Sequence, residues 1–408
     1  MAETTYELFV GIDWGSTAHQ VAVVTAERQI VHEESVAHDG AALQALSERL
    51  QRLGTTPGAV AVALELPHGA IVDGLLARGF AVFAINPKQL DRFRDRYSSA
   101  GAKDDRRDAV VLASALVTDR PAFRRLHAED PRLIRLRELS RVEDDLRSEA
   151  VRLANRLREQ LQRFYVQVLT LCPAADEPWL WALLELAPTP ADARRLKRPA
   201  VQRILRDHRI RRLTADAVLS AVQTIPLPVA PGTAAAAAEH MALLLPRLRL
   251  VVTQRAECAR RIERALEDLQ GQPQHRDVAI LRSLPGVGRV VAATMLAEAS
   301  RLLAARDYHA LRVQTGVAPV TRQSGKRRVV GMRYSCNPRL RNAVHYWGQV
   351  SVQRDPRSQA HYQRLRQDGH SHARAIRGVV DRLLSVLVAM LSSQTCYDAA
   401  RRHAVTTG

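Results

Sequence analysis

Four acidic residues near the start of the chain have the types and spacing of a metal-binding site. Asp13 and Glu65 each end an apolar run typical of a buried strand, while Asp105 and Asp108 are one helical turn apart and share a helix face. Like charges this close repel one another unless cations bind between them. Two Mg²⁺ ions held by such carboxylates can activate the attacking oxygen and stabilise the leaving oxygen in phosphoryl transfer. Each residue alone is ordinary after a strand or at a helix start, but together they favour a catalytic site.

Ser324 is the candidate nucleophile in the last third of the chain. It precedes Gly325, and the stretch from Arg312 to Arg354 contains nine lysines and arginines and no acidic residue. A serine that attacks a phosphodiester needs an accessible loop and positive charge near the phosphate oxygens. From the residues alone, a Ser-Gly turn beside a phosphate-contacting surface is at least as good an interpretation.

The segment Leu284-Pro285-Gly286-Val287-Gly288-Arg289 is similar to a helix-hairpin-helix element, because an apolar helical stretch follows it up to Glu298. In such an element the turn amides and the next helix N-terminus bind a phosphate without distinguishing base sequence. A Gly-x-Gly turn between helices can also be purely structural. The residues expected to contact nucleic acid are Gly286, Gly288, Arg289, Arg322, Lys326, Arg327, Arg328, Arg333, Arg339 and Arg341.

The elements that must position these residues follow from the apolar periodicity, which predicts an α/β domain over residues 1–128. Strands are expected at Leu8–Asp13, Gln20–Thr25, Gln29–Val36, Ala59–Glu65 and Ala81–Ile85, and helices at Gly40–Leu53, Gly69–Arg78 and Asp104–Val117. A mixed sheet covered by helices accommodates this order of elements.

The pattern becomes helical from Pro131 onward. Apolar residues at steps of three and four between Leu139 and Val168 predict one long amphipathic helix with a coiled-coil partner, and Leu248–Leu269 is expected to be its return arm. Residues 172–240 are interrupted by prolines and predict little. The expected domains are therefore an α/β domain over 1–128, a coiled-coil region over 129–275 and a mostly α-helical domain over 276–408.

The net charge of the chain indicates which kind of binding partner to expect. The 408 residues have a formal net charge of +18, yet residues 1–128 hold 14 basic and 16 acidic side chains, so the excess lies in the remainder. This predicts salt-dependent binding of a polyanion. Nucleic acid is favoured over a membrane surface, because no amphipathic helix rich in lysine and arginine stands out. No apolar run approaches the roughly 18 residues of a membrane span. Four widely spaced cysteines indicate neither a zinc site nor a disulfide framework, and we expect a cytoplasmic protein.

One rival class shares the motif Gly11-Ile12-Asp13-Trp14-Gly15-Ser16-Thr17, which resembles the first phosphate loop of sugar kinases and actin-like ATPases. That class also needs a second Asp-Gly-rich phosphate loop and a Gly-Gly adenosine loop. The sequence contains neither, and a strongly basic remainder has no role in a sugar kinase.

Together these residues resemble the transposases of the IS one-ten family, DEDD recombinases of bacterial insertion sequences whose relatives include DNA invertases. The resemblance extends over Gly11–Asp13, Glu65, Ala102–Ala109, Leu284–Glu298, Gly316–Gly325 and Arg354–Pro356. It implies a RuvC-like (RNase H-like) first domain, the tetrad Asp13, Glu65, Asp105 and Asp108, and Ser324 as nucleophile. The family's Lys-Thr/Asn-Asp-x-x-Asp is Lys103-Asp104-Asp105-Arg106-Arg107-Asp108 here, so register favours Asp105 and leaves Asp104 open.

The resemblance also implies partners and a mechanism. Family members are tetramers, organised as dimers of dimers, that pair the acidic site of one subunit with the serine of another. A structured bridge RNA guides them to double-stranded donor and target DNA. We therefore expect Mg²⁺-dependent strand cleavage and rejoining through a phosphoserine–DNA link.

Three alternatives remain open at this point: a DNA invertase, a RuvC-like junction nuclease that uses water as nucleophile, and a non-catalytic RNA- or DNA-binding protein. A covalent protein–DNA adduct would separate recombination from the last two. Cleavage without an adduct would indicate the nuclease, and no cleavage would indicate the binding protein.

Overall fold

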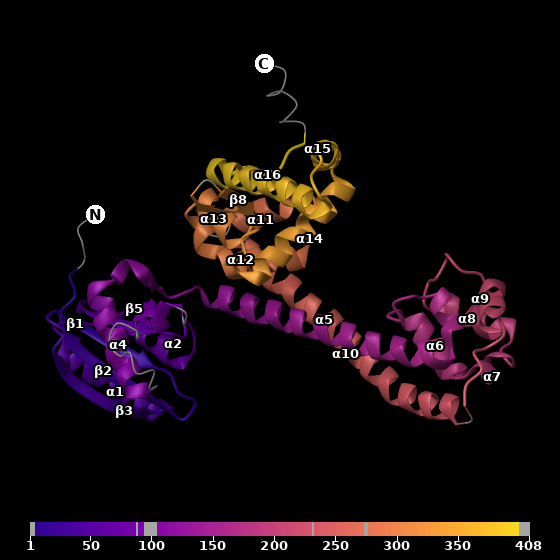
Figure 1. Ribbon diagram of the computed structural model, residues 1–408, viewed down its shortest axis with the longest axis horizontal. Coiled ribbons are helices and arrows are strands. Elements are labelled where there is room, and N and C mark those ends of the chain that lie inside the picture. Colours follow the sequence, from indigo (N-terminus) through magenta and orange to yellow (C-terminus); the bar gives the residue numbers. More distant parts are fainter. Residues whose placement is uncertain are drawn as a thin grey trace, which may run out of the picture. The chain divides into compact units, whose positions relative to one another are not determined.

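The computed structural model in Figure 1 describes residues 5–86, 89–93, 104–230, 232–272, 276–325 and 327–399. The chain divides into two compact units, Met1–Asp130 and Pro131–Gly408. Among the described residues, no helix combines the length and the apolar character needed to cross a membrane.

The first unit is built on a mixed sheet with the strand order β3-β2-β1-β4-β5-β6. Its strands are β1 (Leu8–Asp13), β2 (Ala18–Thr25), β3 (Ile30–Ala37), β4 (Val60–Leu64), β5 (Ala81–Ala84) and β6 (Arg124–Arg125). The central strands β1, β4 and β5 are parallel, and the outer pairings are antiparallel. The five predicted strands are confirmed to within a few residues, whereas the two-residue β6 was not predicted.

Helices cover both faces of this sheet. On one face, α1 (Gly40–Leu53) and α2 (Ala70–Ala77) pack on a core that includes Val10 and Ile12 of β1. On the other face, α4 (Asp105–Thr118) packs on a core that includes Phe9. Alternation along β1 therefore turns its odd-numbered residues toward α4. The mixed α/β architecture is confirmed and is consistent with the RuvC-like fold that the resemblance implied.

Gly11 brings the backbones of β1 and α4 into contact. A Cβ atom added at Gly11 would lie 1.9 Å from the carbonyl oxygen of Ala109 and 2.6 Å from the amide nitrogen of Ala113. No side chain fits in that space, so the glycine and the two small helix residues together fix how closely α4 approaches the sheet.

Two long helices, α5 (Pro131–Phe164) and α10 (Thr233–Gln270), pack along each other in the second unit. The long amphipathic helix and its return arm are confirmed, but α10 begins well before Leu248 and includes the alanine run. The prediction failed because Pro246, an unfavourable residue inside a helix, lies within α10. Their assembly into a coiled coil with another chain stays a prediction.

Short helices join the end of α5 to the start of α10. They are η3 (Val166–Thr170), α6 (Pro178–Leu186), α7 (Pro190–Ala193), α8 (Arg198–Asp207) and α9 (Ala215–Val222). Their core contains the buried Trp179 and Trp181 and extends onto both long helices. The sequence predicted none of these helices, because prolines divide them into short pieces without long periodic runs.

The remaining elements form a mostly helical group. They are α11 (Arg276–Ser283), α12 (Arg289–Ala304), α13 (Tyr308–Gln314), β7 (Val320–Ser324), β8 (Arg327–Gly331), α14 (Pro338–Arg354), α15 (Pro356–Gln367) and α16 (His372–Ser393). The predicted helical character is confirmed. Because their core also includes the C-terminal part of α10, the domain boundary at residue 275 stays a prediction.

Replacing Gly11 by alanine tests the close approach of β1 and α4. We expect Gly11→Ala to lower the free energy of unfolding of the first unit by at least about 2 kcal/mol, because the methyl group would force α4 away from the sheet. Gly40→Ala is the matched control, since nothing lies within 4 Å of a Cβ atom there. It should change stability by less than about 1 kcal/mol. Equal thermal unfolding of both variants would contradict this account.

Candidate active site

Three carboxylates converge where β1 meets α4. One ligand oxygen each from Asp13, Asp105 and Asp108 lies within 4.8 Å of the other two. Asp13 is the last residue of β1, and the other two occupy the first turn of α4. Asp108 is buried, Asp13 half-buried and Asp105 exposed, so the cluster opens from the interior toward solvent. Clustered oxygen donors of this type suit a hard divalent cation.

The structure separates Asp105 from its neighbour Asp104. Asp104 is the N-cap of α4, and its carboxylate accepts a hydrogen bond of 3.1 Å from the backbone amide of Arg106. Asp105 instead belongs to the acidic cluster. The helix start therefore gives the two adjacent aspartates different surroundings: Asp104 caps α4, whereas Asp105 lies in the cluster.

Glu65 follows β4 at the same edge of the sheet as Asp13. In the parallel pairing of β1 with β4, Ile12 is opposite Leu64, so Asp13 and Glu65 are the next residues in register. Glu65 is half-buried but does not belong to the cluster of three. The structure thus brings three of the four predicted carboxylates together and leaves the fourth beside them.

Two contacts lie next to the acidic cluster, one at the first turn of α4 and one at the turn that follows β1. Arg106 pairs with Glu33 of β3, and its hydrogen bonds hold the pKa of Glu33 below the ordinary value. His19 is fully buried, accepts a hydrogen bond of 3.4 Å from the amide of Gly15 and contacts His38 at 2.8 Å. Burial, together with His38, lowers the pKa of His19, which favours the neutral ring next to the turn after Asp13.

Ser324 lies at the tip of an exposed β-hairpin. It is the last residue of β7 and pairs with Arg327 of β8, and Gly325 between them has a positive φ of 55°. The serine is exposed and makes no side-chain hydrogen bond with any other described residue. The expected accessibility is confirmed, although the serine ends a strand instead of lying in an irregular loop.

Comparisons with known families match both the part of the chain that holds the acidic cluster and the part that holds Ser324. A transposase family model matches residues 10–166, which include the acidic cluster, and the model of the IS116/IS110/IS902 transposase family matches residues 278–363, which include Ser324. A putative transposase of IS117 from Streptomyces coelicolor is 32% identical over 99% of this chain and 98% of its own length. The chain belongs to this family of transposases.

Two further relatives agree. The putative transposase y4uE of Sinorhizobium fredii is 45% identical over 51% of this chain and 58% of its own length. A protein of the insertion element IS110 from Streptomyces coelicolor is 28% identical over 96% of both chains. DNA is therefore the substrate class of this transposase, and the acidic cluster is placed to hold a divalent metal.

The residues predicted to contact nucleic acid differ in how exposed their side chains are. Arg289, Arg327 and Arg328 are exposed, while Arg333 and Arg341 are half-buried. Lys326 and the side chain of Arg322 lie outside the described residues.

Arg339 has protein partners at all three guanidinium nitrogens. It pairs with Asp144 at 2.7 Å and with Glu298 at 3.1 Å, and it donates to the hydroxyl of Ser140 at 2.7 Å. Because Ser140 and Asp144 lie on α5 and Glu298 on α12, this arginine connects the start of α14 to both helices. The contacts favour a positioning role for Arg339, which the sequence did not suggest.

The two halves of the glycine turn before α12 differ in their surroundings. A Cβ atom added at Gly286 would lie 2.6 Å from the Ser351 hydroxyl oxygen, and the backbone of Gly286 has a positive φ of 81°. For both reasons only glycine allows this turn to pack on α14. The neighbouring carbonyl of Pro285 accepts hydrogen bonds from Trp347 and Ser351. Gly288 and Arg289, in contrast, are exposed at the N-terminus of α12. Only this second half of the turn is open to a phosphate.

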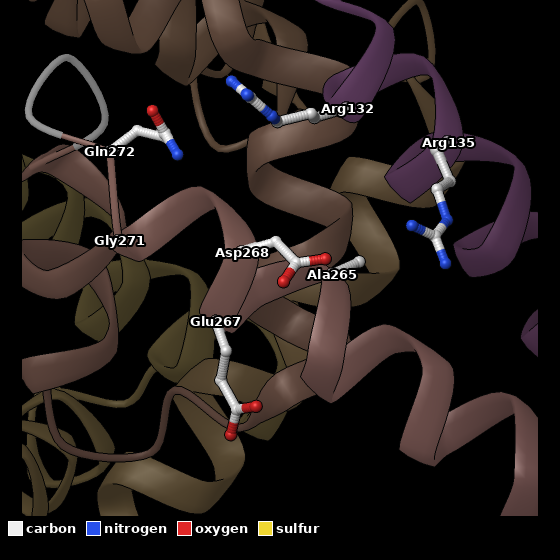
Figure 2. A pocket seen from close by; sticks show the side chains of 7 residues that line it. All are labelled: Arg132, Arg135, Ala265, Glu267, Asp268, Gly271 and Gln272. Atoms are coloured by element: carbon white, nitrogen blue, oxygen red, sulfur yellow. The ribbon is translucent and has the colours of Figure 1, made fainter.

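Two other features of the second unit lie apart from this chemistry. Cys172, Asp176 and Glu177 also cluster, but Glu177 already binds Arg212 and Trp179. A groove between the start of α5 and the end of α10 is lined by Arg132, Arg135, Ala265, Glu267, Asp268, Gly271 and Gln272 (Figure 2). Its lining mixes both signs of charge and includes none of the predicted site residues.

Metal binding by the cluster is testable through stability. Mg²⁺ should raise the unfolding temperature of the first unit, because a ligand that binds only the folded state stabilises it. Asp105→Asn should lose most of this increase. Asp104→Asn should keep it, because asparagine still caps α4. Calorimetric scans with and without Mg²⁺ measure both effects. An unchanged response in Asp105→Asn would exclude it as a ligand.

Proposed function

We propose that this transposase breaks and rejoins DNA by the combined action of its acidic cluster and Ser324. The observation with most weight is the convergence of Asp13, Asp105 and Asp108 within 4.8 Å. Three carboxylates brought this close repel one another without a cation, and that repulsion supports a metal site in preference to a structural role.

Mg²⁺ is the proposed metal, because its preferred ligands are oxygens such as these carboxylates. Asp13, Asp105 and Asp108 would hold it, with Glu65 as a fourth ligand from the adjacent strand end. When bound, the metal would polarise the scissile phosphate and favour attack on phosphorus. Because Asp105 is exposed, the side of the cluster that faces solvent is available to the DNA backbone.

Ser324 would be the attacking group. Its hydroxyl gives up its proton, its oxygen forms a bond to phosphorus, and the bond from phosphorus to a DNA oxygen breaks, leaving a free DNA hydroxyl. A hydroxyl of a new partner strand then attacks the phosphoserine and releases the serine. The number of phosphoester bonds is conserved, so the reaction needs no ATP.

Cations near the serine would bind the phosphates on either side of the scissile bond. Arg327 and Arg328 follow Ser324 on the exposed hairpin, and Gly288 and Arg289 present the N-terminus of α12. We assign Arg322, Lys326, Arg333 and Arg341 to the same contact surface, and Gly286 to the packing that supports it.

We further propose a guide RNA and a site shared between subunits. The exposed side chains of Arg152, Arg156, Arg158 and Arg163 on α5 offer phosphate contacts away from the hairpin, which supports binding of a structured bridge RNA. Asp13 and Ser324 belong to different units of the chain. A dimer of dimers would allow the cluster of one subunit to act with the serine of another.

The covalent step has a direct test. Transposase mixed with end-labelled donor DNA, bridge RNA and Mg²⁺ should give a labelled, protein-sized band on a denaturing gel. Ser324→Ala should lose that band, because alanine has no attacking oxygen. Ser335→Ala, which removes the next serine along the chain at another exposed position, should keep it. An adduct that persists in Ser324→Ala would show another nucleophile, and cleavage without any adduct would indicate a nuclease that uses water.

A further inference from the structure

A second basic surface lies on the short helices between α5 and α10. Residues 194–212 contain nine lysines and arginines and a single acidic residue, Asp207. All nine basic residues are exposed: Arg194, Arg195, Lys197, Arg198, Arg203, Arg206, Arg209, Arg211 and Arg212. We refer to this set as the α8 surface.

Nearby acids neutralise only part of the α8 surface. Asp207 pairs with Arg203 and Arg206, Asp216 with Arg198, and Glu177 with Arg212. The other five cations make no salt bridge with any residue in the part of the chain that the structure describes: Arg194, Arg195, Lys197, Arg209 and Arg211. Their mutual repulsion costs stability, which a polyanion would relieve.

The backbone under this surface is held by apolar packing. Val201 and Leu205 of α8 are buried at 1% and 6% exposure in the same core as Trp179 and Trp181. The opposite side of α8 presents Arg203 and Arg206 to solvent. The cations that flank the helix are thus presented from a fixed backbone, which lowers the entropic cost of binding a rigid partner.

Neither part of the proposed catalytic site uses this region. The two matching family models cover residues 10–166 and 278–363, and the α8 surface lies between them. The relative from IS117 aligns over 99% of the chain, so the intervening region accompanies the catalytic parts in that protein.

We infer that the α8 surface binds the phosphate backbone of duplex DNA away from the position of cleavage. DNA is favoured because it is the substrate class of the family and because five uncompensated cations on a rigid surface match its regular, dense negative charge. The inference depends on family membership and not on the proposed serine chemistry.

The long helices set how far along the DNA this contact would lie. The core beneath the α8 surface includes Leu153–Phe164 of α5, whereas the core of the C-terminal helices includes Leu136 near its other end. A helix of 34 residues is about 50 Å long. A duplex running beside it would span about 15 base pairs between the two ends.

Two triple variants test the inference, one that removes three charges from the α8 surface and one that removes three charges elsewhere. The first variant is Arg194→Gln/Arg195→Gln/Lys197→Gln. The control is Arg260→Gln/Arg261→Gln/Arg264→Gln, whose arginines all pair with Glu257 on α10. Both full-length variants lose the same net charge. Binding to a duplex of about 40 base pairs is measured across a salt series, and each contacted phosphate adds about 0.9 to the slope of log affinity against log salt.

We expect the first variant to reduce that slope by about 2 to 3 and to weaken binding at least about tenfold at physiological salt, while the control changes the slope by less than about 1. Equal losses in both variants would show a general charge effect and overturn the inference. A loss confined to a structured RNA of similar length, with duplex DNA binding unchanged, would overturn the DNA assignment. Because the assay measures binding alone, failure of the serine mechanism would not affect it.

Discussion

The contact between the backbones of β1 and α4 at Gly11 determines whether the acidic cluster exists. A Cβ atom there would lie 1.9 Å from the Ala109 carbonyl oxygen, so the helix reaches this position only over a glycine. The approach brings the first turn of α4, with Asp105 and Asp108, to the end of the strand where Asp13 lies. The site is therefore formed by main-chain packing, and the proposed cation would relieve the repulsion among its carboxylates.

A second set of contacts fixes the start of α14, which follows the serine hairpin in the chain. Arg339 pairs with Asp144 and Glu298, and Asn337 donates to Glu298 while its side-chain oxygen caps α14. Asp144 lies on α5 and Glu298 lies on α12, so these contacts tie the start of α14 to both helices. The hairpin is held together by the antiparallel pairing of β7 with β8, and the segment after it is tied back by hydrogen bonds from Arg333 to Ala318 and from Asn337 to Gln314. The proposed nucleophile and the acidic cluster are thus each supported by residues to which we assign no chemical step.

Much of the first unit could be predicted from sequence because its strands are short, apolar and separated by polar turns. The predicted acidic residues lie at strand ends and at a helix start, and the apolar periodicity of the sequence also indicates where these elements begin and end. Burial and partners were not predictable: the pattern grouped Arg339 with the phosphate contacts, although its charge is neutralised internally. Likewise, Gly286 resembled a phosphate-binding glycine but is required by its contact with Ser351.

The middle of the chain was the least predictable part. Pro246 concealed the true start of α10, and helices of four to ten residues, such as α7 and α8, have too few turns for a clear period. The region nonetheless has its own apolar core and a dense basic surface. The contribution that we infer for it is electrostatic, and it can be recognised only when exposed and paired cations are distinguished in three dimensions.

The central claim, that the acidic cluster and Ser324 act together in one cleavage, is tested most directly by mixing two inactive variants. Asp13→Asn and Ser324→Ala proteins, one of them carrying a size tag, are combined with labelled DNA, bridge RNA and Mg²⁺ under conditions that allow subunit exchange. A shared site predicts that the mixture regains adduct formation and that the labelled DNA is attached only to the Asp13→Asn chain. A mixture that remains inactive after verified exchange, or an adduct on the Ser324→Ala chain, would contradict the account.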